Sequence, residues 1–292
     1  MSEQLEGTTR RAVCVVASVV IPAHDEAAVI GRTLGGLLDR PGNSRLEVIV
    51  VCNGCTDDTA DVARAYEGVR VIEIPAPSKL AAVQVGNSVA TTYPRVHLDA
   101  DVTISGADVL ALARAIRGGV HAAAPERLVS LRRSSWVVRC YYRVWEQLPQ
   151  VREGLFGRGV IALSEEGQRR VDALPRVMSD DLATSEAFSS SERRIVEGAF
   201  VVVRPPRTTA DLLRRRVRVV TGNVQVTELG IRQESSVTTP SVLLRMAVRD
   251  PRVGVRIPLF LGIGLVARWR SRRAVRTGDF TTWLRDESSR AA

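Results

Sequence analysis

Apolar runs and helical patterns alternate along the first 125 residues of the chain. Runs rich in valine and isoleucine predict β-strands over 13–21, 46–51, 69–74 and 95–98. Apolar residues at helical spacing predict helices over 27–38, 56–66, 78–91 and 108–117. Strands that alternate with helices in this way predict a parallel sheet with covering helices.

Beyond residue 125 the pattern is less regular. Its apolar spacing predicts helices over 136–148, 241–249 and 256–269, and short strands over 159–163 and 194–203. An arginine-rich helix or turn is expected at 211–220. The whole pattern therefore predicts an α/β fold, with a mostly parallel Rossmann-like sheet, helices on both faces and a mainly helical C-terminal extension.

Polar residues follow each of the four predicted N-terminal strands, and ligands bind at strand ends in sheets of this kind. In chain order these residues are Asp25, Glu26, Asn53, Lys79, Asp99 and Asp101. Because the carboxyl ends of parallel strands meet at one edge of the sheet, we expect these side chains to gather on one rim.

The composition is that of a globular chain, with 292 residues, 45% hydrophobic and 25% charged. It excludes a largely disordered, collagen-like or disulfide-rich protein. The four scattered cysteines favour a reducing, cytoplasmic location. The net charge of +9 is uneven: residues 1–125 carry −3 and residues 126–292 carry +12. A basic second half is typical of chains that face phosphates, membrane surfaces or nucleic acid.

Two apolar segments raise the question of a leader or a membrane span. Arg10 and Arg11 precede the run 12–23, which could be a short signal peptide, but a buried strand is the better interpretation. The run 257–267 is shorter than the ~18 residues that a membrane span needs. With its flanking arginines it is expected to lie at the inner face of the membrane or, as the open alternative, to pack on the rest of the protein.

Two acidic pairs are candidates for chemistry. Asp99 and Asp101 follow a strand and could hold a divalent cation through oxygen ligands, or simply form a solvated turn. Asp180 and Asp181 repel each other, so one of them could act as a general base. The alternative is that this second pair caps a helix that begins near Leu182.

A Cys-x-x-Cys motif supports a rival redox function. Cys52 and Cys55 lie between a predicted strand and a predicted helix, as in thioredoxin-like sites. The acidic residues that follow would disfavour a thiolate, so a thiol oxidoreductase is the less favoured interpretation.

The basic run 214–218 could bind a diphosphate, form a solvated face or contact nucleic acid. Only 4% of the residues are aromatic, so platforms for base stacking are scarce and no nucleic-acid partner is expected.

Taken together, the motifs resemble the family 2 nucleotide-sugar glycosyltransferases, which have the GT-A fold. The resemblance rests on PAHDE at 22–26, LEVIVVCNGCTDDT at 46–59, SKLAAVQVGN at 78–87 and HLDAD at 97–101. It is good over 13–125, the expected nucleotide-sugar-binding half. It is weaker over 126–223, the expected acceptor and catalytic half. It leaves a tail at 1–12 and a C-terminal extension at 224–292.

The resemblance implies a role for several residues in binding the donor. The residues implied to line the nucleotide pocket are Pro22, Ala23, Asp25, Glu26, Asn53, Lys79, Asp99 and Ala100. Among them, Asn53 stands where the family usually has an aspartate that contacts the base, so the base preference stays open. Asp99 is implied to contact the ribose, and Asp101, with Asp99, is implied to hold Mn²⁺ or Mg²⁺.

The resemblance also implies the catalytic groups. Asp181, or in second place Asp180, corresponds to the family's acidic base. Arg215 and Arg218 correspond to an arginine motif near the diphosphate, although Val219 replaces its usual tryptophan.

The implied activity is metal-dependent transfer of a sugar, with inversion, from a nucleoside-diphosphate sugar to an acceptor hydroxyl. The acceptor is left open as a lipid, a saccharide or a small molecule. A retaining GT-A transferase, a sugar nucleotidyltransferase and a basic non-enzymatic binding module are the remaining alternatives.

Overall fold

The computed structural model describes residues 15–39, 45–232 and 236–276. Its strands are β1 (Ala17–Ala23), β2 (Leu46–Asn53), β3 (Val69–Ile74), β4 (Arg95–Leu98), β5 (Thr103–Ile104), β6 (Ala122–Val129), β7 (Val160–Leu163) and β8 (Arg193–Val203). Its helices are α1 (Ala27–Leu38), α2 (Thr59–Arg64), α3 (Lys79–Val89), α4 (Gly106–Ala115), α5 (Trp136–Trp145), α6 (Pro149–Glu153), α7 (Glu165–Asp172), α8 (Asp180–Glu186), α9 (Thr209–Glu228), α10 (Pro240–Arg249), α11 (Pro251–Gly254) and α12 (Ile257–Arg276).

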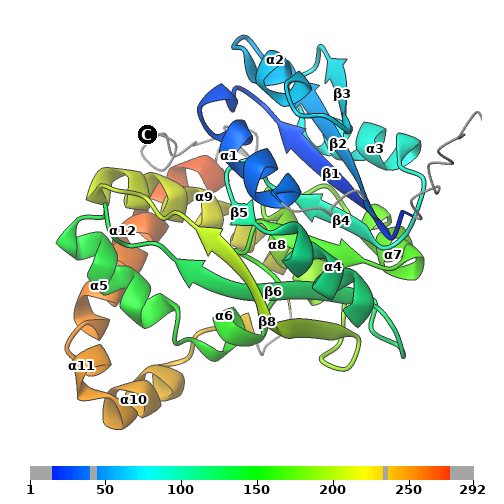
Figure 1. Cartoon of the computed structure of the whole chain (residues 1–292). Coiled ribbons are helices and arrows are strands. Elements are labelled where there is room, and N and C mark those ends of the chain that lie inside the picture. Colours follow the sequence, from blue (N-terminus) through cyan, green and yellow to red (C-terminus); the bar gives the residue numbers. More distant parts are fainter. Residues whose placement is uncertain (1–14, 40–44, 233–235, 277–292) are drawn as a thin grey trace, which may run out of the picture.

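The strands form one mixed sheet in the order β3-β2-β1-β4-β7-β6-β8-β5 (Figure 1). Strands β3, β2, β1 and β4 pair in parallel, as the alternating pattern predicts. Strand β7 is antiparallel to both of its neighbours, and β5 is antiparallel to β8. The predicted α/β fold with a mostly parallel sheet is therefore confirmed.

Helices cover both faces of the sheet because its strands alternate buried side chains between them. On one face, Ile21 and Val50 pack with Ile30 and Leu34 of α1. On the other, Ile49 and Val51 pack against α3. Helix α3 can lie this close to β1 because residue 86 is glycine: a Cβ there would lie 2.3 Å from Val20 Cγ1.

Strand β6 and helix α7 were not predicted. The sequence of β6, AAAPERLV, contains three alanines and a proline and so lacks a strand signal. The pairing of β6 with β8 shifts register between Pro125 and Glu126, where the proline is accommodated. Most residues of helix α7 are polar or charged. Ser164 is its N-cap residue, and the Ser164 hydroxyl accepts a hydrogen bond from Gly167 N. Pairing with β8 defines β6, and the Ser164 cap fixes the start of α7.

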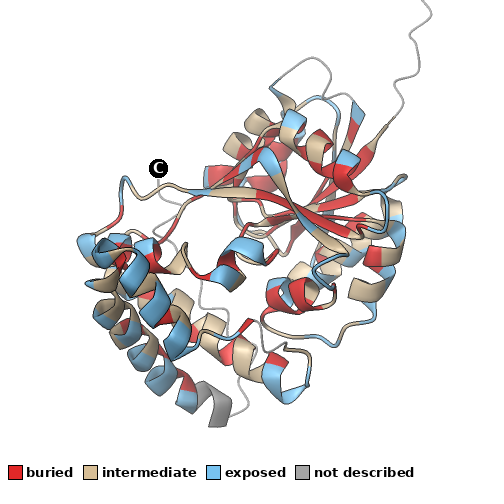
Figure 2. Ribbon diagram, turned by 90° about the horizontal axis from the view of Figure 1, so that it is seen from below, coloured by how far each residue is buried: buried red, intermediate tan, exposed pale blue. Residues whose placement is uncertain are grey.

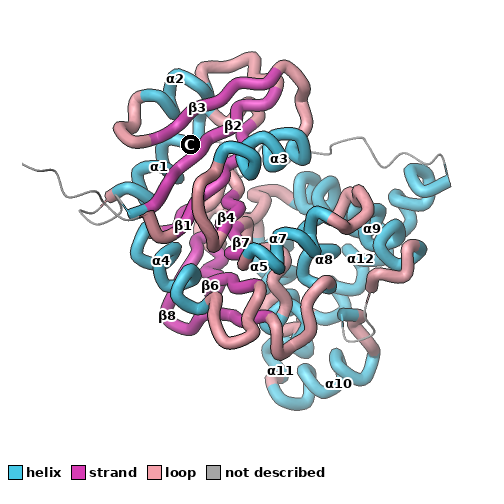
Figure 3. Tube along the Cα trace, turned by 90° about the vertical axis from the view of Figure 1, so that its right-hand side faces the viewer, coloured by secondary structure: helices cyan, strands magenta, loops and turns pink. Residues whose placement is uncertain are grey.

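The C-terminal helices form a separate layer beside the sheet (Figure 3). Helix α9 is 20 residues long, twice the predicted length, and α12 packs along it and along α5. The ring of Tyr141 on α5 stacks on Phe260 of α12 with centroids 4.9 Å apart. The predicted helical extension is confirmed for the described residues 236–276. Residues 1–14 and 277–292, which include the predicted tail, Arg10 and Arg11, lie outside the described ranges.

Within those ranges, no helix combines the length and the apolar character needed to cross a bilayer.

Candidate active site

The carboxyl ends of β1, β2 and β4 open into a cleft of about 2650 Å³ that extends to α8, α9 and α12. Most of the residues expected to form the site line this cleft. They are Pro22, Glu26, Asn53, Lys79, Asp99, Ala100, Asp101, Asp180, Asp181, Arg215 and Arg218. Residues from the two halves of the chain are thus brought together on one rim, although Asp101 and Asp180 are 79 positions apart in the sequence.

Lys79 joins the two acidic pairs. Its ammonium nitrogen lies 3.0 Å from Asp99 Oδ1 and 3.3 Å from Asp180 Oδ2. Ser78 caps α3 by accepting from Ala81 N, which fixes the start of the helix and places Lys79 at its first position. The only lysine of the chain therefore neutralises charge where the two motifs meet.

The titration of these groups reflects this arrangement. Burial disfavours the charged form of Lys79, but the carboxylates of Asp180 and Asp99 outweigh it and raise the pKa of Lys79. Burial and the neighbouring carboxylate of Asp101 raise the pKa of Asp99 despite the lysine. Burial also acts on Asp180, but Lys79 outweighs it and lowers the pKa of Asp180.

We expect Lys79→Met to lower kcat/KM for donor turnover by about 30- to 150-fold, since electrostatic groups of this kind contribute ~2–3 kcal/mol. The substitution leaves Asp99 and Asp180 without the cation that offsets their repulsion. Lys79→Arg should recover part of the loss because it restores the charge. Steady-state kinetics of the three proteins test this, and equal activity of wild type and Lys79→Met would show that the ammonium has no functional role.

The loop that carries Asp99 and Asp101 is held on both sides. Asp99 N donates to Gly159 O at 2.7 Å, and the hydroxyl of Thr33 contacts Ala100 O and Val102 O at 2.7 Å each. Gly159 has φ +69°, and a Cβ there would lie 2.6 Å from Val102 Cγ1 and 3.2 Å from Asp99 Oδ2. The loop therefore needs glycine at 159 to leave room for the Asp99 carboxylate.

Asp99 and Asp101 fit the requirements of a divalent cation. Both line the cleft, and they are close enough for the charge of Asp101 to raise the pKa of Asp99. A cation between them would relieve that repulsion, and carboxylate oxygens are the ligands that Mg²⁺ and Mn²⁺ prefer.

Asp181 is held by backbone donors. Gly157 N donates to its Oδ2 at 3.0 Å and Leu182 N to its Oδ1 at 2.8 Å. Asp180 and Asp181 both lie in the first turn of α8, and the N-cap residue is Ser179. The alternative that this pair caps the helix is therefore correct in placing the pair at the start of α8, where the helix dipole stabilises acidic side chains. The N-cap position itself is occupied by Ser179.

Two arginines, Arg158 buried and Arg127 half-buried, brace the loop that contains Gly157. Arg158 donates to the carbonyl oxygens of Gly154, Pro125, Val151 and Arg152. Its burial lowers the pKa to about 9. Arg127 donates to Gly157 O at 2.9 Å and lies over the ring of Trp145. The sequence alone does not single out either residue, because an isolated arginine gives no signal of a bracing role.

The basic run 214–218 divides between two environments, as expected for a helix. Arg215 and Arg218 lie three residues apart on α9 and both line the cleft. Burial lowers the pKa of Arg218, a cost that Asp181 and Asp180 partly offset. Arg214 pairs instead with Asp211 one turn back. The segment is thus neither a uniform solvated face nor a continuous patch for nucleic acid.

His97 is a cleft residue that sequence analysis did not single out. Its Nε2 lies 3.1 Å from Asn87 Oδ1. Burial, with Lys79 next to it, lowers the pKa of His97 to about 4, so the imidazole is neutral near pH 7. A neutral ring can share the cleft with Lys79 without repelling it.

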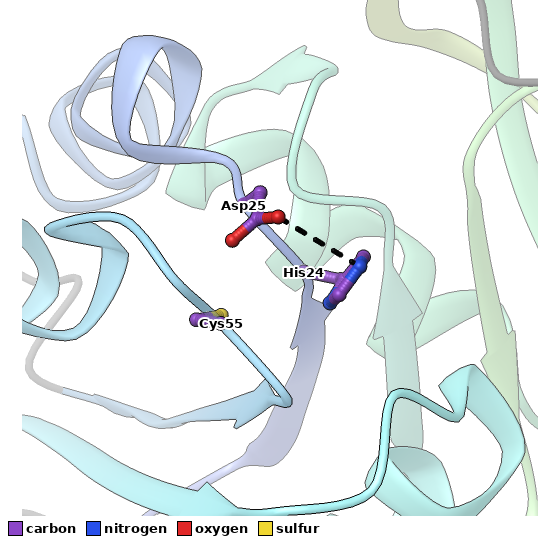
Figure 4. Close-up of side chains that lie close together, drawn as sticks. All are labelled: His24, Asp25 and Cys55. Carbon is purple, nitrogen blue, oxygen red and sulfur yellow. Dashed lines mark ion pairs between the residues drawn. The ribbon is translucent and has the colours of Figure 1, made fainter.

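The first strand ends contribute in different ways (Figure 4). Asn53 is buried and lines the cleft, and its side-chain amide donates to Ala23 O at 2.8 Å. Asp25 has φ +49°, and its carboxylate accepts from Thr56 N at 2.7 Å, which lowers the pKa of Asp25. Ala23 and Asp25 are not among the cleft-lining residues. Asp25 instead ties together the turns that follow β1 and β2.

The Cys-x-x-Cys motif lacks the environment of a redox site. Cys52 is buried in the sheet core, and this burial raises its pKa to about 12, the opposite of what a reactive thiol needs. Cys55 Sγ donates to Ala23 O at 3.4 Å. Ligand atoms of His24, Asp25 and Cys55 lie within 4.8 Å of one another, but each residue is engaged in bracing the turns (Figure 4).

Comparisons with known proteins agree with this geometry. Residues 18–155 match the model of glycosyl transferase family 2. No curated protein matches the chain at a significant level.

Solved structures with the same fold are numerous. A mannosyltransferase from Pyrobaculum calidifontis, in complex with GDP-Man and Mn²⁺, has a TM-score of 0.60 and 19% identity over 90% of this chain and 76% of its own. Glucosyl-3-phosphoglycerate synthase from Mycobacterium tuberculosis, with Mg²⁺ and UDP, has a TM-score of 0.51 and 20% identity over 75% of this chain and 80% of its own. At this identity the likeness establishes the fold. The chain therefore has the GT-A fold, and the match over residues 18–155 confirms its resemblance to the family 2 glycosyltransferases.

Proposed function

We propose that the protein transfers a sugar from a nucleoside-diphosphate sugar to an acceptor hydroxyl, with inversion and with Mn²⁺ or Mg²⁺ as cofactor. One observation carries the proposal: Lys79 contacts both Asp99 and Asp180, so the metal-binding and base motifs share one cleft. The complexes of the structural neighbours with GDP-Man, UDP, Mn²⁺ and Mg²⁺ support it. In this proposal residues 13–125 bind the donor and residues 126–223 supply the base and the acceptor site.

The donor must lose a diphosphate, so the cleft must stabilise the charge that develops on it. Asp99 and Asp101 would hold the cation, which when bound acts as a Lewis acid toward the diphosphate. Arg215 and Arg218 add fixed positive charge from α9. Because these groups are held before the donor arrives, little reorganisation opposes the reaction.

The acceptor hydroxyl must lose its proton as it attacks the anomeric carbon. Asp181 is proposed as the base: Gly157 N and Leu182 N orient its carboxylate at the cleft wall. Asp180 is less suited, since its Oδ2 is engaged by Lys79. A single base that serves a direct attack inverts the anomeric centre, which is why inversion is proposed over retention.

A donor screen tests the proposed function. We expect one of the UDP-, GDP- or dTDP-sugars to bind at least about tenfold more tightly with Mn²⁺ than with EDTA, a difference of ~1.4 kcal/mol. Isothermal titration calorimetry measures this directly. If none of the donors binds with either cation, the proposal is wrong; metal-independent binding of a donor would refute the metal dependence alone.

A further inference from the structure

Helices α10, α11 and α12 leave large apolar side chains in contact with solvent. The exposed fractions are 68% for Leu244, 77% for Val248, 78% for Val255, 62% for Leu265 and 69% for Trp269. We call these five residues the C-terminal face. Figure 2 shows exposed positions along α12, the helix whose last turn is grey. Single exposed apolar residues are ordinary, but five within 26 positions of sequence call for an explanation.

On each of the two longer helices the exposed apolar residues share one side. Leu244 and Val248 are four residues apart on α10, and Leu265 and Trp269 are four apart on α12, so each pair shares one side of its helix. A neighbouring side of α10 is buried through Leu243, which packs with Leu148 and Val151, and α12 is buried through Ile263 and Ala267. The helices are therefore apolar on both sides, and only the inner side has a partner within the part of the chain described.

Basic residues are interspersed along the sequence with the residues of the C-terminal face. Between positions 240 and 272 the chain has seven arginines and one acidic residue, Asp250, which gives a net charge of +6. Six of the arginines are exposed: Arg245, Arg249, Arg252, Arg268, Arg270 and Arg272. Neither Arg245 nor Arg249 has an acidic neighbour within salt-bridge distance in the described ranges.

We propose that the C-terminal face docks on the surface of an anionic lipid bilayer. The apolar side chains can enter the boundary of the acyl chains. The arginines between them can contact the anionic headgroups. A second copy of the chain fits less well, because two faces of charge +6 repel each other. Nucleic acid also fits less well, because it would leave the apolar residues unburied, and Trp269 is the one aromatic residue among the five of the C-terminal face.

This docking would bring the proposed active site close to the membrane, and its functional meaning rests on the proposed function. Helix α12 carries part of the C-terminal face and also forms one wall of the cleft. Leu261 and Leu265 are exposed and also line the cleft that contains Asp181. A chain docked through the C-terminal face therefore holds the α12 wall of its cleft at the lipid boundary. An acceptor carried on a lipid would be within reach from there.

Co-sedimentation of the full chain with liposomes tests the docking. We expect binding to liposomes that contain phosphatidylglycerol at low salt, and little binding to pure phosphatidylcholine. Reversing two charges in Arg245→Glu/Arg249→Glu should weaken binding at least about tenfold, given ~1 kcal/mol for each basic residue near the surface. Leu244→Ser/Val248→Ser should also weaken binding without any change of charge.

Two controls make the outcome specific. Arg114→Glu/Arg117→Glu changes the net charge equally, at exposed positions at the end of α4 and just after it, and should reduce binding less than the α10 pair. Asp101→Asn should bind liposomes like the wild type, so a failure of docking is distinguished from a failure of the proposed chemistry. The proposal is overturned if the wild type does not bind anionic liposomes, or if both charge reversals weaken binding equally. Light scattering that shows a dimer abolished by Leu244→Ser/Val248→Ser would also overturn it, in favour of a second copy.

Discussion

Asp101→Asn is expected to lower sugar transfer by about 100- to 1000-fold, because a Lewis-acidic cation contributes several kcal/mol to leaving-group departure. Asp101 lies in the cleft, two residues from Asp99, on a loop that Thr33 and Gly159 hold in place. Loss of one carboxylate removes a charged ligand without removing its neighbour. The substituted protein should therefore still bind a donor weakly but lose most of the benefit of Mn²⁺.

The measurement is kcat/KM against Mn²⁺ concentration for wild type, Asp101→Asn and a matched control. Asp39→Asn is a suitable control, because Asp39 is an exposed aspartate at the end of α1 that does not line the cleft. We expect the control to follow the wild-type metal curve. An unchanged metal curve in Asp101→Asn would place the cation elsewhere in the cleft.

The strand ends were the part of the site that the sequence could predict. A run such as LEVIVV has few alternatives to a buried strand, and the polar residue after it must then lie at the edge of the sheet. That reasoning placed Asn53, Lys79, Asp99 and Asp101 correctly on one rim. It also placed Asp25 there, whereas the structure engages this carboxylate with Thr56 N. A polar residue at a strand end can form hydrogen bonds within the turn instead of facing the cleft, and its position in the sequence does not distinguish the two outcomes.

The parts that the sequence did not predict depend on contacts far apart in the chain. Gly159 matters because β7 passes beside the loop after β4, and nothing near residue 159 signals that neighbour. Arg158 matters because four carbonyl oxygens converge on it. The arginine run shows the same effect: only the helix period and the position of α9 decide that Arg215 faces the cleft while Arg214 pairs with Asp211.

Asp181→Asn should lower kcat by about 100- to 10,000-fold, the range associated with loss of a general base. The KM for the donor should change little, because this carboxylate is assigned to the acceptor proton and not to the diphosphate. Asn can accept from only one of Gly157 N and Leu182 N, so a modest loss of stability of ~1 kcal/mol is also expected. A thermal unfolding curve separates that loss from the loss of catalysis.

Asp180→Asn is the matched comparison for this prediction, since both residues lie in the first turn of α8 and only Asp180 contacts Lys79. We expect a smaller fall in kcat, of about tenfold, together with a change in donor KM, because freeing one side of Lys79 alters the charge near Asp99. A larger loss of kcat in Asp180→Asn than in Asp181→Asn would reassign the base to Asp180. The sequence does not decide which of the two aspartates is the base. Because their partners differ, the ratio of kcat between Asp180→Asn and Asp181→Asn decides it.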